Sequence, residues 1–153
     1  MKLILQFAET GSVVVGEETV GQIGRGVVCL VGIHKDDTDE DLEWTVNKLL
    51  SFKCFDGDDG TPNQKTIRDI NGEILLVSQF TLHARLGSGR RPDFSHSMGG
   101  EKARAEFQKF VDKVKEAYAP EKVQTGEFGA MMKVHIVNDG PITYTFDSFN
   151  KAQ

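Results

Sequence analysis

Two short polar segments, far apart in the chain, carry residue types that could bind and hydrolyse an ester. Residues 78–82 (Ser-Gln-Phe-Thr-Leu) follow the apolar run 74–77, and residues 138–143 (Asn-Asp-Gly-Pro-Ile-Thr) follow the strand-like run 134–137. Polar groups at the end of a strand are held by a rigid scaffold yet stay accessible, which is the usual situation of functional groups. Both segments are therefore candidate sites.

The first segment could stabilise the negative charge that develops when an ester carbonyl is attacked. The backbone N–H groups of Phe80 and Thr81 are suitable donors, and losing one such donor typically costs ~3–4 kcal/mol of transition-state stabilisation. The candidate catalytic residues are Ser78, Gln79, Phe80 and Thr81. If the strand continues through them, successive side chains alternate between its two faces. The alternative is an ordinary strand end whose hydroxyls cap loose backbone groups.

A side-chain nucleophile in this segment would need a general base beside it. His83 follows Thr81 by two residues, so an extended strand would bring both side chains to one face. This is thin support for a Thr–His pair, and the alternative is a surface or loop histidine without a role in the chemistry. We expect the second, in which case His83→Ala would be nearly silent.

The second segment combines two conflicting turn signals. Asp139-Gly140 between two strands is typical of a two-residue hairpin turn. Pro141 removes the next backbone donor from the ladder, which conflicts with a simple hairpin. The plain alternative is an ordinary Gly-Pro loop, and only ~5–6% of X–Pro bonds are cis, so the sequence does not reveal the isomer.

Together the two segments resemble the signature of the D-aminoacyl-tRNA deacylases, the D-tyrosyl-tRNA deacylase family, which remove D-amino acids from tRNA. The similarity covers nearly the whole chain, with the matching runs in the family's order. It includes three further runs, at residues 26–33, 90–95 and 125–130. The pattern of elements, in which strands outnumber helices and most neighbours are expected to be antiparallel, predicts an α+β fold with a curved, mostly antiparallel sheet and two main helices. The resemblance implies that this sheet is barrel-like.

The resemblance also implies a mechanism and an assembly. In that family the terminal ribose 2′-hydroxyl of the tRNA assists hydrolysis, backbone atoms recognise the substrate, and no cofactor takes part. The Gly-Pro bond is cis and enters the pocket of the partner subunit, where its carbonyls exclude an L-side chain. This implies a homodimer acting on aminoacyl-tRNA, including glycyl-tRNA. The implied substrate-binding residues are Asn138, Gly140, Pro141 and Thr143.

The chain departs from the family pattern at two positions. Gln6 is usually followed by an arginine that lies near the Gly-Pro element, whereas Phe7 follows here, and Met131 stands where aspartate is common. Phe7 supplies bulk but no hydrogen-bond donor. A deacylase of relaxed chirality that clears small L-aminoacyl errors is therefore one alternative. A tRNA-binding module without catalysis is another.

Composition limits the class of protein. The 153 residues, 39% hydrophobic and 27% charged, predict a single domain over residues 1–153. No apolar run approaches the ~20 residues that cross a bilayer, and the start of the chain turns polar too early for a secretory signal. Cys29 and Cys54 are predicted to be buried free thiols, which favours a reducing, cytoplasmic location.

No motif indicates a metal or a dinucleotide cofactor. The acidic segment 56–62 lacks the spacing and the closing glutamate of an EF-hand, and the glycine-rich segment 21–26 precedes a strand instead of opening a helix. The histidines lack the spacing of a metal site: His34, His83, His96 and His135.

Charge is distributed unevenly along the chain. The net charge is −5, yet residues 83–115 contain eight basic and four acidic side chains. A local basic stretch can attract a phosphate backbone, and the residues we expect to bind tRNA are Arg90, Arg91 and Lys102. The alternative is a solvated helix face with ion pairs.

Periodicity and turn residues predict the elements that position these groups. Helices are expected at 36–52, capped by Thr38, and at 102–118. Strands are expected at 2–7, 12–15, 27–33, 74–81, 132–137 and 142–146.

Overall fold

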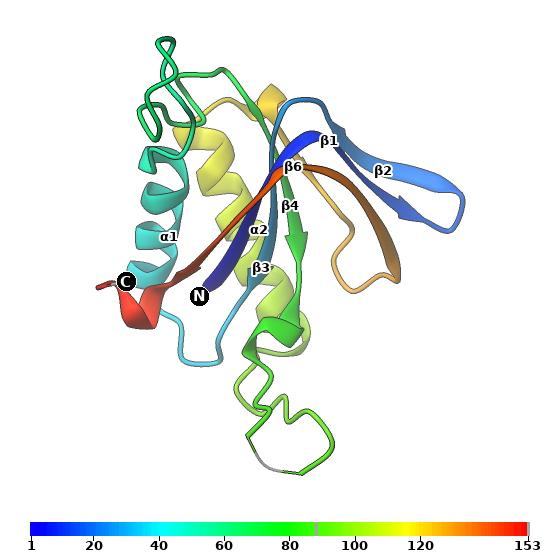
Figure 1. Ribbon diagram of the computed structural model, residues 1–153. Coiled ribbons are helices and arrows are strands. Elements are labelled where there is room, and N and C mark those ends of the chain that lie inside the picture. The colour runs from blue at the N-terminus through cyan, green and yellow to red at the C-terminus, as the bar shows by residue number, and fades with distance from the viewer. Residues whose placement is uncertain (88, 153) are drawn as a thin grey trace.

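The computed structural model describes residues 1–87 and 89–152. Two helices lie side by side against one face of a curved sheet, and a hairpin projects from the other side of the molecule (Figure 1). The main elements are β1 (Lys2–Val15), β2 (Glu18–Ile23), β3 (Gly26–Gly32), α1 (Asp39–Ser51), β4 (Glu73–Ser78), α2 (Gly100–Ala117), β5 (Val123–Thr125) and β6 (Met132–Asp147). Short 3-10 helices cover Phe80–His83, Pro120–Lys122 and Ser148–Asn150.

Local sequence signals determine where the helices begin. The hydroxyl of Thr38 accepts from the N–H of Asp41, while the Asp41 carboxylate accepts from the N–H of Thr38, which closes a capping box. Acidic side chains in the first turn of α1 further favour its start. Both expected helices are confirmed, with α1 shorter than the expected 36–52 and α2 starting slightly earlier than 102.

The sheet combines antiparallel and parallel pairs. β1 pairs antiparallel with β2, β3 and β6, whereas the pairs β3–β4 and β4–β5 are parallel. The parallel pairs require crossovers, which α1 and α2 supply. Because both crossovers step in the same direction across the sheet and such connections are right-handed, both helices cover the same face. The expected α+β class and barrel-like sheet are confirmed, as a mixed sheet.

Both faces of the central strands are buried. Val27, Cys29 and Val31 of β3 pack under the helices, whereas Val28 packs in a second cluster formed where β1 curls over the sheet. Burial on both faces explains why β3 and β4 read as continuous apolar runs. This double layer holds the end of β4 rigidly.

The strand prediction also missed the course of the chain at β1, β2 and β6. β1 continues unbroken from Lys2 to Val15 and bends, so its two halves form one strand. The glycine-rich residues before β3 belong in part to β2, which the sequence did not predict as a strand. β6 runs through the Asp-Gly-Pro corner, with an insertion instead of a turn.

The two cysteines are buried free thiols, as expected. Burial raises the pKa of the Cys54 thiol to about 12 and that of Cys29 further still, so neither is a reactive thiolate at neutral pH. Among the described residues, no helix is both long and apolar enough to cross a membrane.

Candidate active site

The corner after β4 contains Ser78, Gln79, Phe80 and Thr81. β4 ends at Ser78, the N–H of Gln79 donates to the carbonyl of Val31 at 2.8 Å, and the chain then turns into the 3-10 helix. The expected strand through Thr81, with its alternating side chains, is therefore wrong. In the described part of the chain, the N–H groups of Phe80 and Thr81 have no hydrogen-bond acceptor, so both can donate to a ligand.

The turn separates the Thr81 hydroxyl from the His83 ring. The amide of Gln79 donates to the Thr81 hydroxyl. His83 is only 4% exposed, and its Nε2 lies 3.1 Å from the carbonyl oxygen of Gly32. The Thr–His pair is therefore not formed. The expectation of a surface or loop histidine is also wrong, because the 3-10 turn directs this side chain inward.

A small cavity opens beside the corner. Its wall contains Ser78, Gln79 and Phe80 from the corner and apolar side chains from other elements. The apolar lining residues are Val31, Ile33, Met98, Ala103 and Phe128. Sequence reasoning gave the last three no role. The available signal for Phe128 was its position in the family-like run 125–130.

The Gly140–Pro141 loop is an insertion in β6. Gln6 pairs with Thr143 and Ala8 pairs with Asn138, so four residues of β6 face one residue of β1. The Gly140–Pro141 peptide bond is cis, as the resemblance implied. Gly140 has φ 116°, and a Cβ there would lie 2.7 Å from the N of Ile142, so the loop requires glycine.

Asn138 ties the two ends of this loop together. Its Nδ2 donates to the carbonyl of Phe7 at 2.8 Å and to the carbonyl of Ile142 at 3.1 Å. Its Oδ1 accepts from the Gln6 amide at 3.2 Å and from the Thr143 hydroxyl at 3.4 Å. One amide therefore uses both its donors and its acceptor to brace the loop.

Phe7 is a core residue in this chain. Its ring is 7% exposed and stacks on Phe55, with ring centroids 4.2 Å apart and planes at 12°. A tilted contact with Tyr144 lies on another side. Phe7 therefore offers the loop a hydrogen-bond acceptor, its backbone carbonyl, and no side-chain donor. The donor in this contact is the side-chain amide of Asn138.

Within one chain, the corner and the loop lie at opposite ends of the sheet. The loop faces Phe7, which is level with Val27 and Ile74, whereas Ser78 is level with Val31. Four residues along a strand span about 13 Å, and three strand spacings separate β6 from β4 by about 14 Å. The two segments therefore do not share one pocket within a single chain.

The basic stretch divides into two parts. Lys109 and Lys113 of α2 pair with Asp39 and Glu43 of α1, which is the solvated, ion-paired face expected as the alternative. Arg90, Arg91 and Lys102 are exposed, and among the described residues they have no ion-pair partner. Figure 1 shows the loop between the 3-10 turn and α2 extending away from the body of the protein.

In residues 1–87 and 89–152, no group of three or more histidine, cysteine or acidic side chains is arranged to hold a metal ion. The corner presents backbone N–H groups and the Gly-Pro loop presents backbone carbonyls. Groups of these kinds can bind the carbonyl oxygen of an ester and an amino group, respectively.

The family model described as D-Tyr-tRNA(Tyr) deacylase matches residues 4–147, a span that contains both segments. The chain belongs to this deacylase family. A "D-aminoacyl-tRNA deacylase" of Thermotoga petrophila is 43% identical over 97% of both chains. Another, from Kluyveromyces lactis, is 45% identical over 97% of this chain and 99% of the relative.

The family fold is also found among solved structures. The "c-Myc DNA Unwinding Element Binding Protein" superimposes with a TM-score of 0.92 at 40% identity, covering 96% of this chain and 98% of that one. This deacylase-family chain therefore shares both sequence and architecture with its relatives over nearly its full length.

Proposed function

We propose that this chain, acting as a single domain, hydrolyses the ester that links a D-amino acid to tRNA, releasing the free amino acid as a proofreading step of translation. Family membership supports the reaction class. The observation that carries the proposal most directly is the insertion at Gly140–Pro141, braced at both ends by Asn138. Glycyl-tRNA is a second substrate, because glycine has no side chain to exclude.

The proposed mechanism relies on the backbone of the corner. The unpaired N–H groups of Phe80 and Thr81 hold the oxyanion as the ester carbonyl is attacked. The Thr81 hydroxyl is engaged by Gln79, and His83 is turned away from it. This lack of a side-chain nucleophile and base is consistent with assistance from the 2′-hydroxyl of the tRNA.

The proposed working unit is a homodimer. The Gly-Pro loop of one subunit enters the pocket beside the Phe80 corner of its partner, with its carbonyls meeting the amino group of the substrate. The distance between corner and loop within one chain supports this arrangement. An exposed apolar surface near both segments, including Phe80, Val137 and Ile142, is of the kind that a partner covers.

One assay separates this function from its rivals. The protein is incubated with D-tyrosyl-, L-alanyl- and glycyl-tRNA, and the released amino acid is counted. Release from D-tyrosyl- and glycyl-tRNA alone supports the proposal, whereas additional release from L-alanyl-tRNA indicates relaxed chirality. No release with retained tRNA binding indicates a nucleic-acid-binding module, the kind of role that the name of one relative describes.

Thr81→Val tests the backbone mechanism. We expect kcat/KM to fall less than about 10²-fold, because the substitution removes the hydroxyl and keeps the N–H group, whereas losing a true nucleophile costs far more. A loss of about 10⁵-fold, with fold and tRNA binding intact, would restore Thr81 as the nucleophile. Circular dichroism and a tRNA-binding assay serve as controls.

Replacing Arg90, Arg91 and Lys102 together by glutamine tests the proposed tRNA-binding surface. Affinity should fall for every aminoacyl-tRNA alike, and the log–log salt slope should flatten by about 0.7–0.9 for each phosphate that the variant no longer neutralises. The matched control replaces Lys109 and Lys113, which already pair with α1, and should leave the slope unchanged. An unchanged slope in the triple variant would mean that these residues only solvate the surface.

A further inference from the structure

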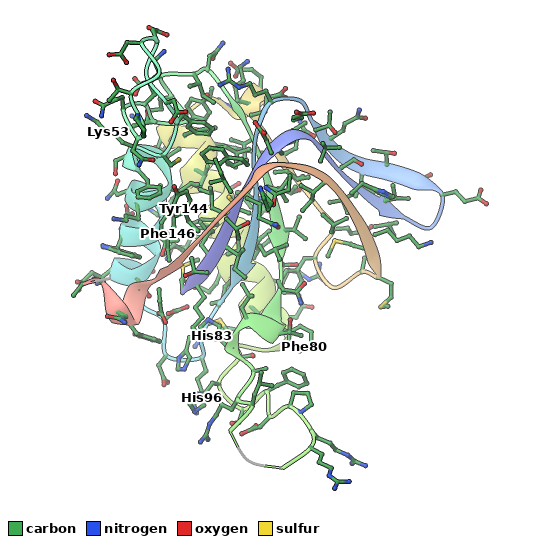
Figure 2. The ribbon with its side chains drawn as sticks, viewed as in Figure 1. Lys53, Phe80, His83, His96, Tyr144 and Phe146 are labelled. Carbon is green, nitrogen blue, oxygen red and sulfur yellow. The ribbon has the colours of Figure 1, made fainter. Side chains whose placement is uncertain are left out.

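His83 closes the 3-10 turn that carries the proposed oxyanion donors. Its side chain points into the protein, and Nε2 lies 3.1 Å from the Gly32 carbonyl oxygen at the end of β3. A carbonyl only accepts, so Nε2 carries the proton and donates it. The ring therefore links the end of the turn to the end of a buried strand, and Figure 2 shows it below the sheet near Phe80.

The turn packs directly on the strand at this point. A Cβ added to Gly32 would lie 2.8 Å from the Cβ of Leu82, 3.1 Å from the carbonyl oxygen of Gln79 and 3.2 Å from Cδ2 of His83. No larger residue fits at Gly32 without displacing the turn. Two interactions with Gly32 thus set the position of the turn: the close packing against its Cα and the hydrogen bond from His83 to its carbonyl.

Two further histidines connect His83 to the segment that leads into α2. The ring of His34 meets that of His83 edge-on at 5.1 Å and that of His96 at 5.2 Å. The backbone N–H of His34 donates to the carboxylate of Asp37 at 2.7 Å. The next residue in the loop, Ser97, donates its hydroxyl to the carbonyl of Phe80 at 2.8 Å.

From this geometry we propose that His83 is a positioning residue, which holds the Phe80–Thr81 amides in the orientation that binds the oxyanion. The inference rests on the proposed function. It replaces the sequence-based expectation that His83→Ala would be silent. His83 does not touch the substrate in this role, because its buried ring acts through the turn and through Gly32.

The ring performs this role in its neutral form. Burial lowers the pKa of His83 to about 4, against the raising effect of its hydrogen bond to Gly32, and the Met1 ammonium, His34 and Lys2 add to the lowering. Asp36 and Asp37, which face His34, act on that histidine in the opposite sense. The donor is therefore present without a charge throughout the neutral range.

The experiment compares two replacements of His83. The amide of His83→Gln can still donate to the Gly32 carbonyl, whereas His83→Leu fills similar volume without a donor. We expect kcat for D-tyrosyl-tRNA to fall about 10- to 100-fold in His83→Leu with KM within about twofold, and to recover to within about threefold in His83→Gln. Asn47→Gln, on the exposed side of α1, is the control and should behave as the native protein.

Amide NMR provides a readout that does not depend on activity. The Phe80 and Thr81 signals should shift in His83→Leu and match the native positions in His83→Gln. If His83→Leu does not fold, Gly32→Ala provides a second test. The added Cβ of this variant pushes on the turn directly from β3 and should produce the same loss of kcat. Native kcat in His83→Leu, or equal losses in both His83 variants, would overturn the inference. A native protein that hydrolyses no aminoacyl-tRNA would instead refute the proposed function, with the NMR comparison still deciding the role of His83.

Discussion

Asn138→Asp should lower the ratio of D-alanyl- to L-alanyl-tRNA hydrolysis by about 10- to 100-fold. The substitution keeps the acceptor that serves Gln6 and removes the two donors that hold the carbonyls of Phe7 and Ile142. Two hydrogen bonds, at roughly 0.5–1.5 kcal/mol each, correspond to about 1–3 kcal/mol. A filter made of backbone carbonyls excludes an L-side chain only while it cannot retreat, so this loss should appear mainly in chirality.

The control for this prediction is Thr145→Val, two residues further along β6, which removes an exposed hydroxyl outside the brace and should change the ratio little. Thermal melting checks that both variants are folded. If Asn138→Asp keeps the native ratio, the loop is held by the partner subunit or by the surrounding strand, and the bracing role of Asn138 is wrong.

The structure also changes how the Phe7 position should be tested. Phe7→Arg would insert a charge where a ring now stacks on Phe55, and an unpaired buried charge destabilises the fold by itself. A change in chirality in that variant could therefore reflect altered packing. That this chain rejects small L-residues less completely than relatives with the arginine stays a prediction, and it is measured on the native protein.

Mixing two inactive variants should restore activity. Thr81→Pro removes one proposed oxyanion donor, and Gly140→Ala forces a Cβ against Ile142 in the loop, so each homodimer should lose almost all hydrolysis. A mixed dimer has one site with an intact corner and an intact loop from different subunits. Random mixing makes half the dimers mixed, and about one quarter of native activity should return.

The control is each variant alone, unfolded and refolded under the same conditions. Mixed dimers can be isolated with two different tags and assayed directly. Sedimentation should show a dimer for the native chain. A stable, fully active monomer, or purified mixed dimers without activity, would mean that the site does not combine the corner of one subunit with the loop of the other.

Elements whose causes are local could be predicted from the sequence. Thr38 and the acidic residues after it form the N-terminus of α1 through interactions three residues apart. The apolar runs of β3 and β4 predict strands buried on both faces, and burial there was observed. The two candidate segments were likewise visible in the sequence, because turn residues interrupt strand-like patterns there.

Other features depend on contacts between distant residues and emerged only in the folded chain. Phe7 became a core residue by stacking on Phe55, and Asn138 became the loop brace by reaching the carbonyl of Phe7. The parallel pairing of β3 with β4 depends on the crossover through α1, which strand patterns do not encode. The expected surface position of His83 was wrong because the chain leaves the strand at Ser78 and enters a 3-10 turn, which packs closely against the distant Gly32.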